Sequence, residues 1–226
     1  MTMFLLMLAL VAQQPQAQPP LRSDTPPSRE LSAGSDIFVE DEQRMLTPAA
    51  LRANQEFGSC VASRSPEEAS RVLRMDHTGT SYRNGLRQLA RNNESCFRAR
   101  RGRMRASGLP FAGAIAEALI ERDAAPLNVR IARASAAGAS VPAFAPADRV
   151  FACVVRSVPD DAATLLATEP GSDAEAAAAG ALQPALALCA RGGPSIQTPT
   201  AGVRALVAAT AFRLLHSTGA QAARSN

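Results

Sequence analysis

The chain has no tryptophan, no lysine and a single tyrosine, and aromatic residues make up only 4% of it. Strands favour β-branched and aromatic side chains, so this scarcity disfavours a β-sandwich. Alanine is abundant, and hydrophobic residues make up 46% of the 226 positions, which is enough to bury a core. The composition therefore predicts a mainly α-helical fold with a core of alanine, leucine and valine.

The charge is nearly balanced. All 24 basic residues are arginines, the acidic residues number 20, and the formal net charge is +4. Such an excess supports solubility and weak attraction to anions, and it does not indicate nucleic acid as a partner. A GC-rich genome also produces a bias toward arginine and alanine, so the arginine content alone assigns no function.

Long apolar runs are absent except at the start, where residues 4–12 are continuously apolar. This run is shorter than the roughly 20 residues that span a bilayer. It fits the apolar core of a signal peptide. We predict a signal peptide over residues 1–17, cleaved after Ala12 or Ala17, and a periplasmic or secreted location. Residues 18–46 are rich in proline, glutamine and serine and are predicted to form a disordered linker.

Cysteine is scarce but regularly placed, at Cys60, Cys96, Cys153 and Cys189. An even number of cysteines in an exported chain indicates disulfides. Zinc sites usually need cysteines two to four residues apart, and a redox site favours a C-x-x-C motif; neither spacing occurs. We therefore assign these cysteines a structural role, and no metal ligand and no cofactor.

The two cysteine pairs have the same spacing of 36 residues, and a shift of 93 residues superimposes them without a gap. The same shift aligns residues 66–69 (Pro-Glu-Glu-Ala) with residues 159–162 (Pro-Asp-Asp-Ala). We predict a tandem duplication of a helical unit. The predicted parts are repeat 1 at 47–123, a connection at 124–145, repeat 2 at 146–217 and a disordered tail at 218–226.

The symmetry favours local pairing, Cys60 with Cys96 and Cys153 with Cys189, because each repeat then closes independently. Four cysteines allow three connectivities, and pairing between the copies also respects the symmetry. A bridge over a loop of this size stabilises a fold by about 3–4 kcal/mol on the chain-entropy model. The short alanine-rich helices and the differences between the copies favour one shared core.

Local signals predict where several helices begin. Thr47 and Pro48 cap and open a first helix that runs to about residue 64. The second helices begin at Pro66 and Pro159, where proline suits the first turn and the carboxylates that follow favour the helix dipole. Ser65 is expected to add a capping hydroxyl in the first copy only.

The later segments are also predicted to be helical, except for one short strand. Residues 172–175 (Ser-Asp-Ala-Glu) form a capping box for a third helix, which Pro184 is expected to kink. Helices over about 110–122 and 201–216 close the two copies. Residues 127–131 alternate between apolar and polar, and this pattern predicts one short strand between the repeats.

No sequence motif of catalysis occurs. The chain lacks a nucleophile elbow, a P-loop, a dinucleotide fingerprint, a metalloprotease motif and an EF-hand loop. His77 is interpreted as a turn residue and His216 as a helix-end residue, so no catalytic residue is assigned. An enzyme with an unrecognised site would use polar residues that the second copy does not repeat, namely His77, Tyr82 and Asn84.

Five arginines fall within eight positions after Cys96, at Arg98, Arg100, Arg101, Arg103 and Arg105. The second copy has Ala-Arg-Gly-Gly there, at residues 190–193, so the patch belongs to one copy. It could bind the phosphates of lipid head groups or another polyanion. A solvated loop is the alternative interpretation.

Three segments carry a resemblance: residues 153–156 (Cys-Val-Val-Arg) with Pro159, residues 167–172 (Ala-Thr-Glu-Pro-Gly-Ser), and Cys189 with the turn that follows it. Over about 57–123 and 150–217 the chain resembles exported, cysteine-bracketed tandem-repeat proteins of sphingomonad-type alphaproteobacteria. The first copy departs from them at residues 76–79. The resemblance implies export and the repeat, and it implies no particular activity.

These observations lead us to expect an exported, non-enzymatic envelope protein with a structural or partner-binding role. Its partner is expected to be an envelope protein or an anionic envelope component, and no membrane span is expected after signal cleavage. The alternatives are an anion-binding module that uses the patch at 98–105, and an enzyme with an unrecognised site.

Overall fold

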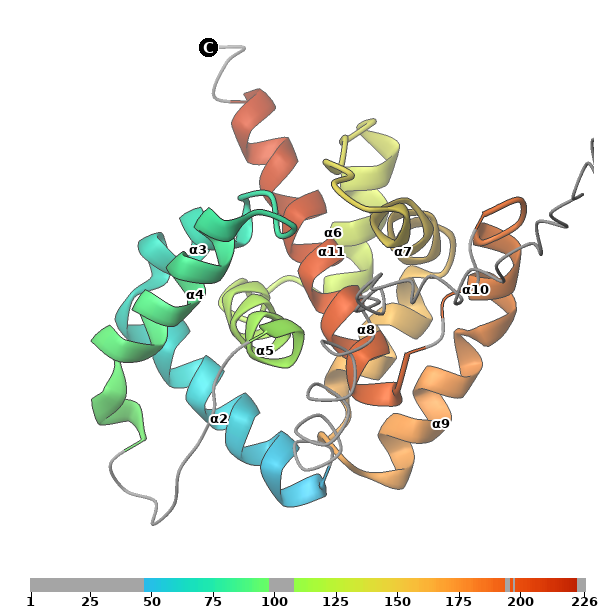
Figure 1. Cartoon of the computed structure of the whole chain (residues 1–226). Helices are drawn as coiled ribbons and strands as arrows, with labels where there is room; N and C mark the ends of the chain where they lie inside the picture. Colours follow the sequence, from blue (N-terminus) through green and yellow to red (C-terminus); the bar gives the residue numbers. More distant parts are fainter. Residues whose placement is uncertain (1–46, 98–107, 194–195, 197, 223–226) are drawn as a thin grey trace, which may run out of the picture. The chain divides into compact units, whose positions relative to one another are not determined.

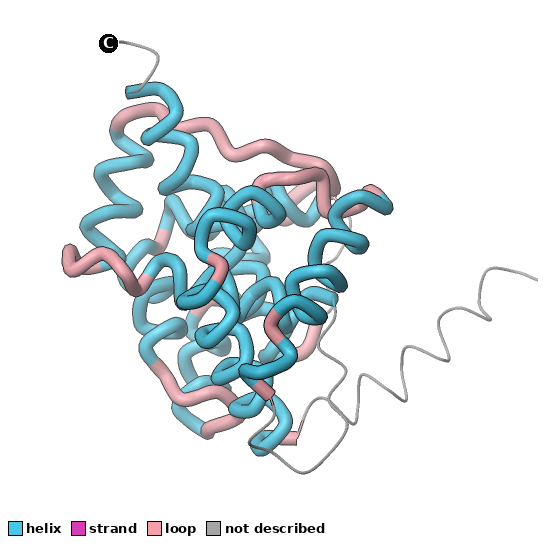
Figure 2. Tube along the Cα trace, turned by 90° about the vertical axis from the view of Figure 1, so that its left-hand side faces the viewer, coloured by secondary structure: helices cyan, strands magenta, loops and turns pink. Residues whose placement is uncertain are grey.

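Helices make up most of the chain that the computed structural model describes, residues 47–97, 108–193, 196 and 198–222, and no strand occurs among these residues (Figure 2). The first predicted repeat contains α2 (Pro48–Arg64), α3 (Pro66–Leu73), α4 (Thr80–Asn92), the short 3-10 helix η2 (Glu94–Cys96) and α5 (Gly108–Ile120). The rest contains α6 (Leu127–Ala136), α7 (Pro146–Ser157), α8 (Pro159–Ala167), α9 (Asp173–Ala181), α10 (Gln183–Cys189) and α11 (Thr200–Ala222). The predicted mainly α fold is confirmed.

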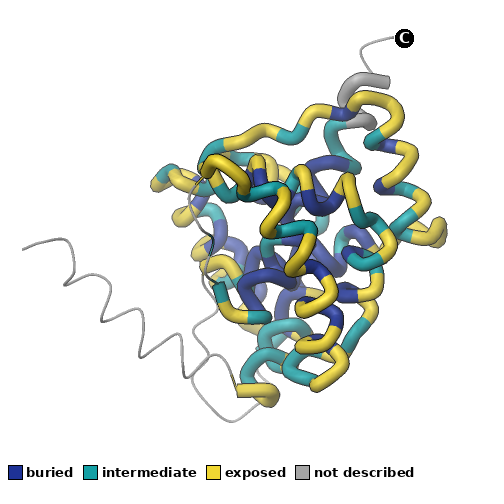
Figure 3. Tube along the Cα trace, turned by 90° about the vertical axis from the view of Figure 1, so that its right-hand side faces the viewer, coloured by how far each residue is buried: buried dark blue, intermediate teal, exposed yellow. Residues whose placement is uncertain are grey.

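The helices α5 and α11 lie at the centre of this arrangement (Figure 1). Every residue of α5 from 111 to 118 is buried, and so is nearly all of α11 from 201 to 214. A helix that is apolar on all sides has to be enclosed by other elements. Accordingly, α5 packs between α2 and α11, and α11 also contacts α6, α7, α8 and α9. Figure 3 shows the buried segments inside and the exposed ones on the surrounding helices.

Small residues let the central helices approach closely. A Cβ on Gly58 of α2 would lie 2.5 Å from the Cβ of Ala114, and a Cβ on Gly113 would lie 2.6 Å from the Cα of Ala205. Glycine at these two points therefore brings α2 and α11 directly onto the backbone of α5. This close packing explains how a core with few aromatic rings is filled.

Buried side chains from both predicted repeats form one hydrophobic cluster. Val61 and Val154, which follow the leading cysteines by one position, are both fully buried, and so are Leu89 and Leu182. The two halves therefore share a single core.

The helix junctions of the two halves also correspond at the shift of 93 residues. Ser65 and Val158, which precede α3 and α8, have φ/ψ angles of −133°/53° and −134°/63°. A proline follows each of them and opens the next helix, as the sequence predicts. These correspondences agree with a tandem duplication, which itself stays a prediction.

The predicted strand at 127–131 is wrong, because these residues open α6. Leu127 and Ile131 match the period of a strand and also that of a helix, where residues four apart share a face. Ile131 and Ala134 are buried against neighbouring helices, whereas Val129 is 44% exposed. The helical period prevails, and the connection between the repeats contains a helix that packs on α8 and α11.

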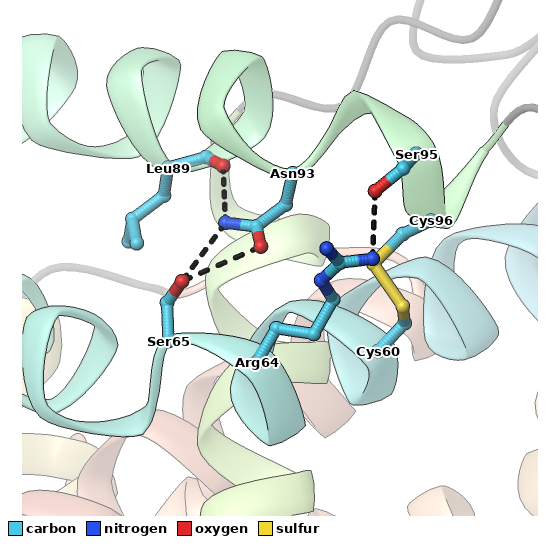
Figure 4. Close-up of a disulfide and its surroundings, with 7 residues drawn as sticks. All are labelled: Cys60, Arg64, Ser65, Leu89, Asn93, Ser95 and Cys96. Atoms are coloured by element: carbon cyan, nitrogen blue, oxygen red, sulfur yellow. Dashed lines mark hydrogen bonds between the residues drawn. A yellow bond between two sulfur atoms is a disulfide. The ribbon is translucent and has the colours of Figure 1, made fainter.

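Ser65 does not cap α3 with its side chain. Its hydroxyl instead lies 3.3 Å from Oδ1 of Asn93 and accepts a hydrogen bond from Nδ2 at 3.2 Å (Figure 4). Asn93 also donates to the carbonyl of Leu89 at 2.9 Å. Because Asn93 is buried, these bonds satisfy an amide that would be costly to leave unpaired, and the serine joins α2 to the end of α4.

Of the capping box predicted for the third helix in the second half, only the serine part is confirmed, because the Glu175 carboxylate accepts from the amide of Gly171 and not from that of Ser172. The Ser172 hydroxyl accepts a hydrogen bond from the Glu175 amide at 3.1 Å, and α9 begins at Asp173. The helix is then interrupted at Leu182, and Pro184 lies in the first turn of α10. The proline cannot supply a backbone donor, which explains why the helix restarts there.

Helix α11 extends to Ala222, past the start of the predicted tail at 218, and no proline interrupts it. The signal peptide and the linker, residues 1–46, lie outside the described residues, as do residues 223–226. Of the described helices, none is long and apolar enough to cross a membrane.

Candidate functional site

Both local disulfides are present. Cys60 is bonded to Cys96 and Cys153 to Cys189, each with a Cα–Cα distance of 5.8 Å. The first bridge joins α2 to η2, and the second joins α7 to the end of α10. Bridges of this kind are consistent with folding in an oxidising, extracytoplasmic compartment.

The surroundings of the first bridge are polar. Arg64 lies beside it and donates from Nη1 to the Ser95 hydroxyl at 2.7 Å (Figure 4). This bond spans the same two segments as the disulfide. The arginine therefore reinforces the link between the end of α2 and η2.

A buried charged cluster surrounds Arg204 of α11. Its Nε donates to Oε2 of Glu117 at 3.0 Å, and a second nitrogen donates to Oε1 of the same carboxylate. Its Nη1 lies 3.4 Å from Oε1 of Glu175, which lies in the first turn of α9. All three side chains are at most 7% exposed, so one guanidinium ties together α5, α9 and α11.

Arg204 also closes the end of α8. It donates to the carbonyls of Leu165 at 3.1 Å and Leu166 at 3.0 Å, and to the Thr168 hydroxyl at 3.0 Å. The last carbonyls of a helix have no partner within the helix, and an arginine can satisfy them. The five donors of this side chain are therefore fully used in holding four helices.

The carboxyl of Glu117 has an unusual environment. Burial raises its pKa above the ordinary value, and its hydrogen bonds with Arg204 and Gln55 oppose that shift only in part. The pocket beside it, also lined by Gln55 and Glu175, holds only about 20 Å³. This is space for about one water molecule, so the pocket cannot admit a substrate.

A second buried cluster surrounds Asp148, in the first turn of α7. Its carboxylate accepts hydrogen bonds from the amides of Phe144 and Ala145, both at 2.8 Å. It also lies 2.9 Å from Nε2 of His77 and 3.2 Å from Nη1 of Arg213. Four donors from three parts of the chain thus converge on one carboxylate that is 3% exposed.

The electrostatics of this cluster follow from its hydrogen bonds. Burial alone raises the pKa of Asp148, but the bonds from His77, Ala145 and Phe144 outweigh it and bring the pKa down to about 2. The carboxylate is therefore ionised at neutral pH, and His77 donates to it through Nε2. Burial raises the pKa of the nearby Tyr82 to about 12, so this phenol stays neutral.

The role of Arg213 resembles that of Arg204. It donates to the carbonyl of Leu73, the last residue of α3, at 3.2 Å, and its guanidinium lies 5.7 Å from the ring centre of Phe144. Leu73 and Leu166 are related by the shift of 93 residues, so an α11 arginine meets the end of α3 and of α8 alike. Both charged clusters therefore act as junctions between helices.

A carboxylate that orients a histidine is also found in general-base catalysis. Here His77 and Tyr82, two of the predicted enzyme candidates, lie together, with ring centres 6.3 Å apart. Asn84 is not part of this group and accepts a hydrogen bond from Arg87 on the surface instead. The structure thus brings two of the three candidates together, next to a carboxylate whose acceptor sites are already occupied.

Another pocket, larger than the one beside Glu117, holds about 270 Å³ and lies between the end of α5, the start of α6 and the end of α8. Ile120, Leu127 and Leu166 form its apolar wall, and Arg130 and Glu121 lie near its rim. Arg130 is fixed there by Asp123 at 3.1 Å. The volume is slightly below the range usual for small-molecule sites, and we assign no ligand to it.

The other predicted residues are placed as follows. The helix-end position expected for His216 is wrong, because α11 continues to Ala222. The histidine Nδ1 lies 2.9 Å from the carbonyl oxygen of Phe212, and burial lowers the pKa of this histidine. The predicted arginine patch, at Arg98, Arg100, Arg101, Arg103 and Arg105, lies outside the described residues. Within the described part of the chain, no three His, Cys, Asp or Glu residues are grouped so that they could hold a metal ion.

The sequence interpretation missed four residues of the charged clusters, Glu117, Asp148, Arg204 and Arg213, and it assigned Glu175 only to a capping box. A usable signal was present, because Glu117 is the single charge of α5, and Arg204 and Arg213 are the two arginines of the otherwise apolar buried part of α11. Charged residues are rarely fully buried unless they are paired. A lone charge on a helix that must be enclosed therefore predicts a buried partner.

No protein-family model matches the chain, and the comparisons with curated proteins and with solved structures find no significant match. The function therefore has to follow from the chemistry of the chain itself.

Proposed function

We propose that the chain is an exported, non-enzymatic protein of the cell envelope that has a structural or partner-binding role. The observation that carries this proposal is the use of its buried charges. The buried charged side chains Arg204, Arg213, Glu117, Asp148 and Glu175 all pair with one another or with nearby backbone groups across helix boundaries. Groups committed in this way hold a fold together and are not available to a substrate.

Export to the periplasm is supported by two independent features. The apolar run at 4–12 has the length of a signal peptide core. The two disulfides each close a loop of 36 residues, an arrangement that persists in oxidising compartments. The resemblance to exported tandem-repeat proteins of alphaproteobacteria points the same way.

The hydrogen bonding of the buried polar groups also supports a non-enzymatic role. Among the described residues, no buried side-chain nitrogen or oxygen lacks a hydrogen-bond partner. Buried polar groups without a partner are rare, and a catalytic role is one reason for their presence. If the chain is an enzyme, His77 and Tyr82 are the residues to test, and a double variant H77A/Y82F with undiminished activity would remove that candidate site.

The partner-binding role can be tested by photo-crosslinking inside cells, because a chain without lysine reacts poorly with amine crosslinkers. A photoreactive residue is placed at Leu188 or Val129, which are 56% and 44% exposed, and at buried Phe151 as a control. The proposal predicts a discrete crosslinked species from an exposed position and none from Phe151. A chain that stays an uncrosslinked monomer at every exposed position tried would contradict it.

A further inference from the structure

Helix α4 presents a stripe of arginines on its outer side. Arg83, Arg87 and Arg91 follow one another at intervals of four residues, and all three are exposed. The rise of an α-helix places them about 6 Å apart along its axis. The opposite side of α4 packs inward through buried Tyr82 and Leu86, together with Leu89.

Among the described residues, the stripe arginines have neutral hydrogen-bond partners. Arg83 donates to the Thr80 hydroxyl at 3.0 Å, Arg87 to the Asn84 amide oxygen at 2.6 Å and Arg91 to Gln88 at 3.0 Å. Helix α4 contains no acidic residue. In the part of the chain that the structure describes, no carboxylate lies within ion-pair distance of these three side chains, so their charges are not paired there.

Folding does not account for the stripe. Like charges four residues apart repel one another and weaken a helix. At the shift of 93 residues, the positions that correspond to Arg83, Arg87 and Arg91 are Ala176, Gly180 and Pro184. The second half of the protein therefore forms its corresponding helices without a charge at these three positions, and a role outside folding remains for the arginines.

We propose that the exposed face of α4 binds the phosphate groups of an anionic phospholipid membrane surface. This inference names a partner class for the binding role proposed above and rests on that role. Guanidinium groups bind phosphate through paired hydrogen bonds. The stripe lies along one outer helix, and α4 lines neither of the pockets described above. The arginine stripe therefore suits an extended surface better than an enclosed ligand.

The surface also argues against single-stranded nucleic acid. Such binding needs aromatic side chains on which bases can stack. The aromatic residue of α4, Tyr82, is only 7% exposed and faces the core. The exposed neighbours of the arginines, such as Thr80, Asn84 and Gln88, are neutral and polar, so the face would bind a membrane by charge and not by insertion.

The test measures co-sedimentation of the full mature chain, with both disulfides formed, with vesicles of phosphatidylcholine alone or mixed with phosphatidylglycerol. The proposal predicts binding only to the mixed vesicles, strong in low salt and weak above about 0.15 M ionic strength. Each arginine near an anionic surface strengthens binding about fivefold. The variant R83Q/R87Q/R91Q should therefore bind about 100-fold more weakly in low salt.

A matched control is R122Q/R133Q/R149Q, which removes three exposed arginines from other parts of the chain and changes the net charge equally. Its affinity should fall by less than about tenfold, because these arginines do not form a stripe. The variant R83K/R87K/R91K should keep most of the binding. Circular dichroism and non-reducing peptide maps establish that each variant is folded.

Several results would overturn the inference. One is an equal loss in the two glutamine variants, which would show that only net charge matters. Another is equal binding to vesicles without phosphatidylglycerol. Loss confined to a variant of the arginines at 98–105, or binding to single-stranded DNA but not to vesicles, would also contradict it. This experiment uses purified protein, so its failure is distinct from a failure of the crosslinking in cells.

Discussion

Arg204 of α11 and Glu117 of α5 face each other in the protein interior, with 3.0 Å between Nε and Oε2, although 87 residues separate them in the sequence. The pair joins the last helices of the two predicted repeats. At the position that corresponds to Arg204, the first half has buried Phe111. The ion pair is therefore a link between the halves and not a feature of each copy.

Replacing Arg204 with alanine should lower the free energy of unfolding by about 3–5 kcal/mol, because it leaves Glu117 and Glu175 buried without a cation. Urea unfolding at neutral pH measures the change. The matched control is R52A, which breaks an exposed pair with Glu169 at 3.3 Å. That variant should lose no more than about 1 kcal/mol. Equal losses in the two variants would contradict the structural role of Arg204.

The lowered pKa of Asp148 predicts that the protein loses stability as the pH falls. Its pKa is about 2 in the fold against an ordinary 3.8, so its contribution is complete above about pH 4 and is lost as the pH falls toward 2. The shift corresponds to about 2 kcal/mol. The free energy of unfolding, measured from pH 5 to about pH 2, should therefore fall less steeply in D148N than in the wild type. Parallel curves for the two proteins would exclude this role.

The pH dependence that Glu117 gives to the free energy of unfolding should have the opposite sign. Burial raises its pKa above the ordinary 4.5, so the fold binds a proton there more readily than the unfolded chain. Its contribution to the free energy of unfolding therefore increases as the pH falls through the raised pKa, down to about 4.5. The variant E117Q should lose this increase, and the same titration, read above pH 4.5, detects it. An unchanged slope in that range would show that Glu117 titrates normally.

Alanine substitutions should have opposite effects on stability at glycines in tight and in open surroundings. G58A and G113A place a methyl group 2.5–2.6 Å from Ala114 and Ala205, so each should cost about 1–3 kcal/mol of unfolding free energy. Gly180 in α9 has no atom within 4 Å of its added Cβ. G180A should stabilise the protein by about 0.5–1 kcal/mol through helix propensity. Thermal and urea unfolding decide between these outcomes, and a destabilised G180A would count against the packing described.

Much of the local structure could be predicted from the sequence. Pro48, Pro66 and Pro159 open helices because proline needs no donor in a first turn, and this rule depends on neighbouring residues alone. The 36-residue spacing of the cysteines similarly indicated local bridges. The error at 127–131 arose where two periods coincide over five residues, since only the later Ala134 distinguishes a helix from a strand there.

The charged clusters could not be predicted in the same way. His77 and Asp148 are 71 residues apart, and nothing near either residue in the sequence identifies its partner. Which carboxylate a buried arginine meets depends on how the helices pack. Arg204 and Arg213 were visible in the sequence only as charges within an apolar helix, and that pattern predicts a partner without naming it.

Removing the disulfides tests their structural role. C60S/C96S and C153S/C189S should each lower the free energy of unfolding by about 3–4 kcal/mol, because each bridge closes a loop of 36 residues. Since the halves share one core, unfolding of each variant should remain a single transition. Two separate transitions, or a negligible loss, would contradict the account of the fold.

The most direct test of the central claim, that this is an exported protein held together by two local disulfides, is a non-reducing peptide map of the chain recovered from its native compartment. The expected map shows Cys60 linked to Cys96, Cys153 linked to Cys189, and an N-terminus after Ala12 or Ala17. Free thiols on a chain that retains Met1 and remains in the cytoplasm would contradict both the location and the role of the cysteines.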